Sequence, residues 1–281
     1  MTEPKRLSSA ADYAAHMAET EVLRLFKANA RQTLLNNWAT TKTLPGFSYP
    51  IVRMVDFLID PNLRLSDGSF NLRETVNCPE TWFNTRMRAV IHAIELYEKD
   101  LTADVYISEQ KTPLYRHFKA RYDHLIGSEY LGDAIPLGRR DAQGLRNEDA
   151  IRLTFQSESF DLVLSFEVLE HIPDYMAALR EARRILRRDG RFYFTAPFNP
   201  GAHDHLIRAK VENGQIVHVM EPEWHGDPVT GEGILCFQHF GWAVLDELRT
   251  CGFASVEVLA FDQIEYGYYT QDPILVIRAV A

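Results

Sequence analysis

The sequence predicts an α/β protein in which a mostly parallel sheet over residues 101–281 follows a small α+β cap over residues 1–100. Strand and helix patterns alternate from Ala103 onward, which is typical of a parallel sheet covered by helices on both faces. One continuous apolar run, at residues 160–166, indicates a strand that is buried on both of its faces. Two further runs, at 255–261 and 274–280, predict a terminal antiparallel hairpin.

Composition sets the class of protein. The 281 residues, 46% of them hydrophobic, are enough for one large domain and a smaller one. A formal net charge of -9 repels phosphate backbones and anionic lipids, so we expect neither nucleic acid nor membrane as a partner. The three cysteines are far apart and no signal peptide or membrane span is evident, which favours a cytoplasmic protein. A homodimer is left open.

The cap is predicted from changes of pattern within the first hundred residues. Residues 10–41 carry apolar side chains at helical spacing without an internal Gly or Pro, which indicates one or two amphipathic helices. Residues 44–77 alternate short apolar runs with Pro and Gly, which predicts a small hairpin. A third helix is expected over residues 85–99.

The sheet and its helices are predicted segment by segment after the cap. The expected strands cover residues 104–108, 125–130, 160–166, 191–196, 255–261 and 274–280. The expected helices cover residues 113–122, 174–188 and 241–251, with Gly190 and Gly252 as the residues that stop the last two.

The densest signal is the stretch SFDLVLSFEVLEHIPD at residues 159–174. Its apolar run ends in a turn of Glu and His, as expected of a strand whose carboxyl end opens into the crevice where α/β sheets bind ligands. Ser165, Phe166 and Glu167 would line that crevice. The stretch resembles the class I S-adenosylmethionine-dependent methyltransferases, which have a Rossmann-like sheet. The resemblance covers roughly residues 103–281 and implies S-adenosylmethionine as cofactor, with Asp149 and Ala150 at its adenine.

The first strand of the sheet departs from the family pattern. Such methyltransferases follow this strand with a glycine-rich turn, but residues 108–115 contain no glycine. Thr112 followed by Pro113 still predicts a capped helix start, and we expect Glu109 and Gln110 to contact the cofactor in place of bare backbone. Glu129 and its neighbour Tyr130 close the second strand. Glu129 comes 20 residues after Glu109, the spacing of a carboxylate that accepts ribose hydroxyls; the alternative is a surface charge at a strand end.

The cap resembles, in degenerate form, a small zinc knuckle found in a subgroup of these methyltransferases. Residues 77–88 look like the second of its two C-x-x-C pairs, but only Cys78 remains, Thr81 stands where the next cysteine is expected, and the segment around Ser48 has none. Four thiolate ligands cannot be assembled. We therefore expect no structural zinc and a cap held by ordinary packing.

Two histidines are candidates for taking the proton of an acceptor hydroxyl. His171 follows the central strand, and His225 lies in a Pro- and Gly-rich loop before Asp227, which would orient its imidazole. Trp224 would form an apolar wall for the acceptor. The alternatives are a His171 that only shapes the loop over the cofactor and a His225 that only caps a turn.

The sequence thus predicts a methyltransferase that acts on a small molecule, with a sugar or a secondary metabolite as candidate acceptors and oxygen favoured over nitrogen. The cap would close over the acceptor, and no metal ligands are expected. One alternative is a binding protein that keeps the fold without catalysis, since the glycines are missing. Another is a metal-dependent hydrolase, for which the candidate ligands are His203, Asp204, His205, His218, Glu223, His225 and Asp227.

Overall fold

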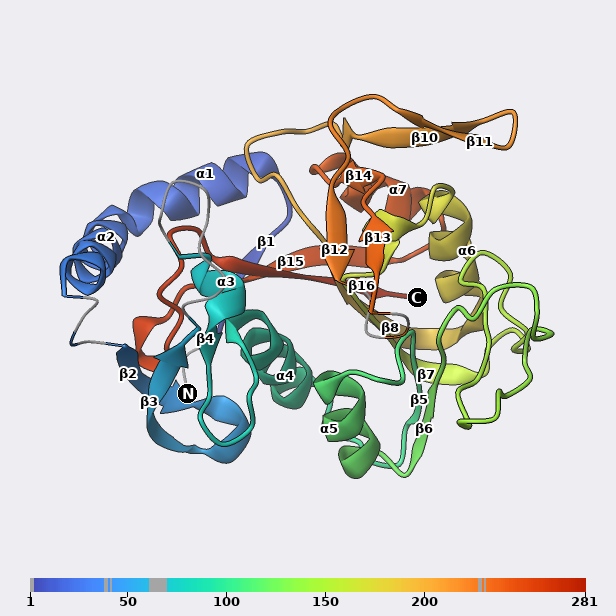
Figure 1. Cartoon of the computed structure of the whole chain (residues 1–281), viewed down its shortest axis with the longest axis horizontal. Coiled ribbons are helices and arrows are strands. Elements are labelled where there is room, and N and C mark those ends of the chain that lie inside the picture. The colour runs from blue at the N-terminus through green and yellow to red at the C-terminus, as the bar shows by residue number, and fades with distance from the viewer. Residues whose placement is uncertain (1–2, 38–39, 41, 61–69, 227–228, 230) are drawn as a thin grey trace. The chain divides into compact units, whose positions relative to one another are not determined.

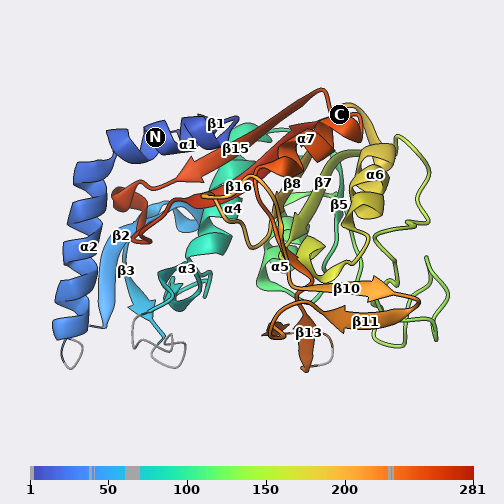
Figure 2. The same ribbon diagram turned by 90° about the horizontal axis from the view of Figure 1, so that it is seen from above.

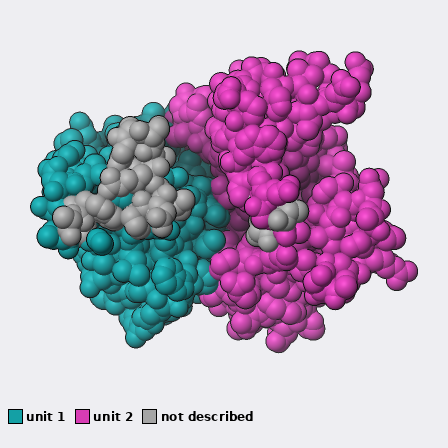
Figure 3. Space-filling model, viewed as in Figure 1, with its two compact units in different colours: residues 1–7, 11–99, 258–276 teal, residues 8–10, 100–257, 277–281 magenta. Residues whose placement is uncertain are grey.

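In a computed structural model of the chain, the described residues are 3–37, 40, 42–60, 70–226, 229 and 231–281. Two compact units are distinguished: unit 1 comprises residues 1–7, 11–99 and 258–276, and unit 2 comprises residues 8–10, 100–257 and 277–281 (Figure 3). The division into 1–100 and 101–281 remains a prediction. Residues 258–276 belong to unit 1, together with most of the first hundred residues.

The central element is a seven-stranded sheet with the order β1-β15-β16-β8-β7-β5-β6 (Figure 1). Strands β6, β5, β7 and β8 run parallel, whereas β16 pairs antiparallel with β8 and β1 pairs antiparallel with β15. This confirms the predicted mostly parallel sheet with antiparallel strands at its C-terminal end. The strands are β1 Lys5–Leu7, β5 Asp104–Ile107, β6 His124–Gly127, β7 Phe160–Phe166, β8 Leu186–Thr195, β15 Ser255–Phe261 and β16 Ile274–Val280.

Three helices of unit 2 connect these strands, namely α5 Pro113–Arg121, α6 Tyr175–Ile185 and α7 Ala243–Thr250. The start of α5 is capped as predicted, because the Thr112 side chain accepts from the backbone N–H of Tyr115. The predicted C-terminal end of α6 is wrong by three residues. Leu186 already pairs with Phe160 of β7, so Gly190 lies within β8 and does not stop the helix.

Between β8 and α7 the chain forms short antiparallel ribbons that we had expected to be loop. They pair β10 Ala209–Glu212 with β11 Gln215–His218 (Figure 2). They also pair β12 Trp224–Gly226 with β13 Gly233–Leu235, and β9 Leu206–Ile207 with β14 Gln238–His239. His225 therefore lies on a strand, opposite Ile234, and not in an irregular loop.

Unit 1 holds the predicted helices and hairpin. The helices are α1 Ala10–Glu19, α2 Glu21–Asn36, α3 Leu72–Thr75 and α4 Thr85–Tyr97, with the short 3-10 turns η1 Tyr49–Ile51 and η3 Ile264–Tyr266. Strands β2 Thr43–Ser48, β3 Arg53–Ile59 and β4 Val76–Asn77 form a three-stranded antiparallel sheet. Among the described residues, no helix is sufficiently long and apolar to cross a membrane.

The apolar core of unit 1 surrounds the position of the degenerate zinc knuckle. Cys78 is buried there among apolar neighbours that include Phe57 and Val76. The hydroxyl of Ser48 lies 3.6 Å from the Cys78 thiol, so the two segments expected to correspond to the knuckle do meet. A zinc-free cap stays a prediction.

Candidate functional site

The carboxyl ends of the parallel strands are where an open α/β sheet binds its ligands. At this edge the loop after β5 is tied to β7: the Ser108 N–H donates to the carbonyl of Leu164 at 3.0 Å. The Ser108 hydroxyl also donates to the hydroxyl of Ser165 at 2.9 Å. Two of the segments predicted to face the cofactor therefore lie in contact with each other.

The glycine-free loop is organised by a carboxylate that follows the neighbouring strand, because β6 ends at Gly127 and the prediction that Glu129 and Tyr130 close this strand is wrong. Glu129 Oε1 accepts from the backbone N–H groups of Gln110 and Lys111, at 2.6 and 2.9 Å. Gln110 Oε1 in turn accepts from the N–H of Arg146 at 2.8 Å, whereas Glu109 is buried. The structure thus brings three of the predicted cofactor residues together at one loop.

A glycine allows close packing at the loop after β5, but it is Gly127 of β6 and not a residue of the loop itself. A Cβ on Gly127 would lie 2.7 Å from the carbonyl oxygen of Glu109 and 2.4 Å from the ring of Tyr115. Any side chain at Gly127 would therefore push the loop away from the sheet. This glycine was missed in the sequence because it lies one strand away from its expected position.

The end of β7 is rigid and locally strained. Ser165 and Phe166 are buried. Glu167 follows with φ of 55°, a left-handed conformation that a glutamate rarely adopts, and its N–H donates to the carbonyl of Thr195 at 2.8 Å. Strain of this kind persists where the surrounding structure fixes it and is concentrated at functional sites.

The predicted adenine residues lie on the loop that follows β6. Asp149 accepts from the N–H of Ile151 at 3.2 Å and from Arg152 Nε at 2.9 Å, so its carboxylate caps the local turn. Ala150 is half-buried, and Tyr130 is 59% exposed. Contact of Asp149, Ala150 and Tyr130 with a cofactor stays a prediction.

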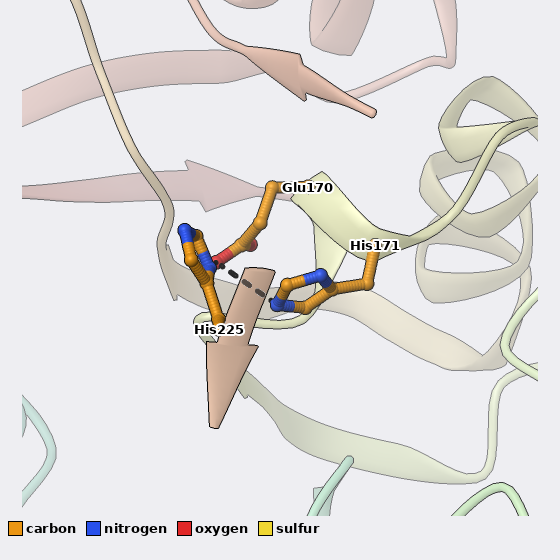
Figure 4. A group of neighbouring side chains, drawn as sticks. All are labelled: Glu170, His171 and His225. Atoms are coloured by element: carbon orange, nitrogen blue, oxygen red, sulfur yellow. Dashed lines mark ion pairs between the residues drawn. The ribbon is translucent and has the colours of Figure 1, made fainter. Parts of the chain in front are cut away.

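A group of ionisable side chains follows β7 directly. Glu170 and His171 lie on the 3-10 turn η2 Leu169–His171, and His225 reaches them from β12 (Figure 4). Glu170 Oε1 lies 3.7 Å from His171 Nε2 and 3.7 Å from His225 Nδ1, and the two imidazole rings meet edge to face with centroids 4.9 Å apart. We call Glu170, His171 and His225 the polar cluster.

The segment after β13 holds η2 in place. The Phe237 N–H donates to the carbonyl of Glu170 at 2.8 Å, and Gln238 Nε2 donates to the carbonyl of Leu169 at 2.8 Å. His171 Nδ1 lies 2.8 Å from the carbonyl oxygen of Leu235. Because a carbonyl only accepts, Nδ1 carries the proton and Nε2 presents its lone pair towards Glu170.

Glu223 orients His225 from the other side. Its Oε1 lies 2.9 Å from His225 Nε2 and 3.0 Å from His239 Nε2, and its Oε2 lies 3.2 Å from Arg208 Nε. Burial opposes ionisation of Glu223, but His225 and His239 nevertheless hold its pKa below the usual value.

The charges of the polar cluster are strongly coupled. Burial raises the pKa of Glu170, although His225 and His171 counteract part of the rise. Glu170 and then Glu223 raise the pKa of His225 to about 9, against the opposing effect of burial. In the metal-free protein His225 therefore carries a proton near neutral pH, which weakens its predicted role as a base that is ready to accept one.

The structure brings the predicted catalytic histidines together, but the carboxylate beside His225 is not the predicted one. Asp227 lies outside the described residues, and Glu223 occupies the orienting position that we had assigned to it. Among the described residues, the predicted metal ligands come together only in pairs, Glu223 with His225 and the exposed His203 with Asp204. His205 pairs with Glu247 at 2.9 Å, and His203 and His218 are exposed.

Sequence analysis missed Glu170, His239 and Cys236. Within the part of the chain that the structure describes, two groups of side chains have ligand atoms within 4.8 Å of one another, Glu170 with His171 and His225, and Glu223 with Cys236 and His239. Burial first, and the negative charges of Glu223 and Glu170 next, raise the pKa of the Cys236 thiol to about 12. The alternation Glu223-x-His225 could have signalled one face of a strand.

Parts of this chain are similar in sequence to known methyltransferases. Residues 113–194 match a family model described as a methyltransferase domain. The chain is 31% identical over 71 residues to a demethylmenaquinone methyltransferase of Staphylococcus saprophyticus, covering 24% of this chain and 30% of that protein. It is 38% identical over 55 residues to a ubiquinone biosynthesis O-methyltransferase of Neisseria meningitidis, covering 19% and 23%. The chain thus spans less than a third of the length of these two relatives.

Among solved structures, an S-adenosylmethionine-dependent methyltransferase of Mesorhizobium loti has 17% sequence identity, with a TM-score of 0.43 over 68% of this chain and 96% of that one. The family match covers α5, β6, β7 and α6 and extends to Phe194 of β8. Residues 113–194 of this chain thus match a methyltransferase domain.

Proposed function

We propose that this chain transfers a methyl group from S-adenosylmethionine to an oxygen atom of a small molecule at the carboxyl end of β7. One observation supports this most: Glu170 and His171 follow β7 directly, within the matched methyltransferase domain, and His225 joins them from β12, so that two imidazoles and a carboxylate lie around one point. Groups that exchange protons are needed for a hydroxyl acceptor, whose oxygen must lose its proton when it is methylated.

The residues around the glycine-free loop fit the cofactor in chemistry. Glu129 offers a carboxylate two residues after the end of β6, and the two N–H groups that Oε1 accepts hold it at the glycine-free loop. We assign the ribose hydroxyls to Glu129 and the adenine to Asp149 and Ala150. The amino-acid part of the cofactor is assigned to Glu109, Gln110, Tyr130, Ser165, Phe166 and Glu167. When bound, S-adenosylmethionine supplies a methyl group on a positively charged sulfur. A nucleophile bonds to the methyl carbon in line with the C–S bond, and the sulfur leaves as the neutral thioether.

The polar cluster is assigned to the acceptor. His171 and His225 face Glu170, whereas Trp224, the exposed neighbour of His225 on β12, points to the other side of the strand, so its predicted role as an apolar wall stays a prediction. The proton of the acceptor hydroxyl would pass to the cluster as a whole. Oxygen is favoured over nitrogen by this acid–base set, and the name of one relative includes O-methyltransferase. Sugars, secondary metabolites and quinol-like molecules are the acceptor classes to test.

Calorimetric titration of the full chain with S-adenosylmethionine and with S-adenosylhomocysteine tests the cofactor assignment. We expect saturable binding in the micromolar range and a loss of at least about tenfold, or about 1.4 kcal/mol, in the variant Glu129→Gln. Glu212→Gln is the matched control, because Glu212 is exposed on β10. Absence of binding at millimolar cofactor would contradict the proposal, as would equal binding by the two variants.

The acceptor class is tested with purified protein, cofactor and a panel of catechols, vicinal diols and primary amines, with methylated product detected by mass spectrometry. Methylation of oxygen acceptors with turnover reduced at least about a hundredfold in His171→Asn is expected. Methylation confined to the amines would overturn the oxygen assignment while leaving the cofactor assignment intact.

A further inference from the structure

The geometry points to a site for one divalent transition-metal ion, bound by Glu170, His171 and His225 at the carboxyl end of β7. Sequence analysis led us to expect no metal ligand here, and none of the comparisons assigns one. The ion-binding site stands on the contacts of these three side chains, whereas its role in methyl transfer rests on the proposed function.

The first argument is the convergence of three ligand atoms. Glu170 Oε1, His171 Nε2 and His225 Nδ1 lie within 4.8 Å of one another, and each nitrogen lies 3.7 Å from the oxygen. Ligands held about 2.1 Å from one ion and about 120° apart would be about 3.6 Å from each other. These separations are too long for hydrogen bonds but match two ligands of a shared ion.

The second argument is the state of the remaining ring nitrogens. A histidine that binds a metal donates its other N–H to a carbonyl or a carboxylate, which fixes the ring. His171 Nδ1 lies 2.8 Å from the Leu235 carbonyl, and His225 Nε2 lies 2.9 Å from the Glu223 carboxylate. Both rings are therefore turned so that their second nitrogen faces Glu170 (Figure 4).

The third argument is the environment of the carboxylate. The Glu170 side chain is 0% exposed, and neither of its oxygens accepts a hydrogen bond from any residue that the structure describes. A buried ionised carboxylate without such partners costs several kcal/mol, roughly, and native proteins rarely leave one. A cation bound by Oε1 would compensate this charge.

The neighbouring group of Glu223, Cys236 and His239 is a weaker candidate. Both oxygens of Glu223 are engaged, Oε1 with His225 and His239 and Oε2 with Arg208. A metal ion would have to displace these partners from Glu223, whereas no residue that the structure describes donates a hydrogen bond to Glu170. We therefore place Glu223 behind the site, as the residue that positions His225.

Two histidines and one carboxylate leave coordination positions open for other ligands. His225 and His171 are partly exposed, whereas Glu170 is not, so the open side of the site faces away from Glu170. An ion there would bind an acceptor through two adjacent oxygen atoms and lower the pKa of the hydroxyl that is to be methylated. The acceptor class would then be a catechol, a vicinal diol or an α-hydroxy ketone.

The test is calorimetric titration of the chelator-treated full chain with Zn²⁺ and with Mn²⁺, and absorption spectroscopy with Co²⁺. Wild type is expected to bind one ion per chain, and Co²⁺ is expected to show the bands of a site with nitrogen ligands. Binding should weaken at least about a hundredfold in Glu170→Gln and in His225→Asn, and about tenfold or more in Glu223→Gln. Folding of each variant is checked by circular dichroism.

His203→Asn is the matched control, since the side chain of His203 is exposed and pairs with Asp204 outside the cluster. It should bind metal as the wild type does. Absence of stoichiometric binding in wild type, or equal binding by the folded His225→Asn variant, would overturn the metal site. Titration of the same preparation with S-adenosylhomocysteine separates this failure from failure of the proposed function, because cofactor binding does not require the cluster.

Discussion

Unit 1 and unit 2 each bury an ionisable side chain almost completely, but they surround it in opposite ways. In unit 1, Arg88 is 1% exposed and donates to the carbonyl oxygens of Val76, Phe83 and Gly267 at 2.7, 3.1 and 3.2 Å. Its guanidinium also lies 3.8 Å above the ring centroid of Phe57. Burial lowers the pKa of Arg88 to about 10, so the group stays charged near neutral pH.

In unit 2, Glu170 is equally buried, but the described residues supply no hydrogen bond to its carboxylate. Its nearest charged partners are the imidazoles of His171 and His225, each 3.7 Å away. A buried charge with backbone partners on several sides fixes the fold around it. A buried charge that the fold leaves without such partners points to a ligand that completes the site.

The largest effect is expected from removing the well-partnered charge. Arg88→Met should lower the free energy of unfolding by roughly 3 to 5 kcal/mol, because three buried carbonyl oxygens each lose a donor from the guanidinium. Urea denaturation monitored by circular dichroism measures the change. Arg188→Met is the matched control: the Arg188 side chain is 92% exposed, so its loss should change stability by less than about 0.5 kcal/mol. Similar values for the two variants would contradict a structural role for Arg88.

A smaller effect is expected from His92, the buried histidine of unit 1. It is stacked on Tyr49 with centroids 3.9 Å apart, lies 4.7 Å from the ring of Tyr266, and has Tyr268 Oη 3.2 Å from its Nδ1. Burial lowers the pKa of His92 to about 4. The unfolded chain, with a pKa near 6.5, therefore takes up a proton first as the pH falls, so the stability due to neutral His92 is present near neutral pH and is lost between about pH 6.5 and 4.

Because of His92, we expect the free energy of unfolding to fall by about 2 kcal/mol between about pH 7 and pH 5. The measurement is urea denaturation at both pH values in wild type, His92→Gln and His117→Gln, the last being a control at a half-buried position on α5. The pH dependence should diminish only in His92→Gln. An unchanged slope in that variant would mean that other groups titrate in this range.

The fold was predictable because its signals are local and repeated. The apolar run of β7 and the two C-terminal strands were assigned with the bounds that the structure has, since buried strands need continuous apolar sequence. The end of α6 was not, because Leu186 has the helical spacing of the preceding residues but pairs with Phe160 of β7. Strand pairing between distant residues overrides a local pattern and leaves no trace in one sequence.

The site was predictable only in part. His171 and His225 were identified because histidines near a strand end suit proton transfer. Glu170 was not identified, because its complete burial depends on packing between residues that are distant in sequence. The role given to Asp227 belongs to Glu223 among the described residues, because the β12 strand places alternate residues on one side of the ribbon. Gly127 was missed for the same reason: its close contact with Glu109 joins two strands.

The smallest change in stability is expected at Glu170, when it is compared with Glu148, a second buried glutamate of unit 2. Glu148 accepts from Arg146 Nε at 2.8 Å, from the N–H of Thr154 at 2.9 Å and from the Thr154 hydroxyl at 2.6 Å. Glu148→Gln should therefore lower the free energy of unfolding by about 2 kcal/mol. In the presence of a chelator Glu170→Gln should leave stability unchanged or raise it by about 1 kcal/mol, because the buried carboxylate has no hydrogen-bond donor to lose among the described residues.

Urea denaturation with and without Zn²⁺ resolves this contrast. Zn²⁺ should stabilise wild type and Glu148→Gln by a similar amount, since an ion that binds only the folded state adds its binding free energy to the free energy of unfolding. It should not stabilise Glu170→Gln. If Glu170→Gln instead loses more than about 2 kcal/mol in the chelator, then His171 and His225 compensate the carboxylate by themselves, and Glu170 belongs with Arg88 as a buried charge that the fold has already neutralised.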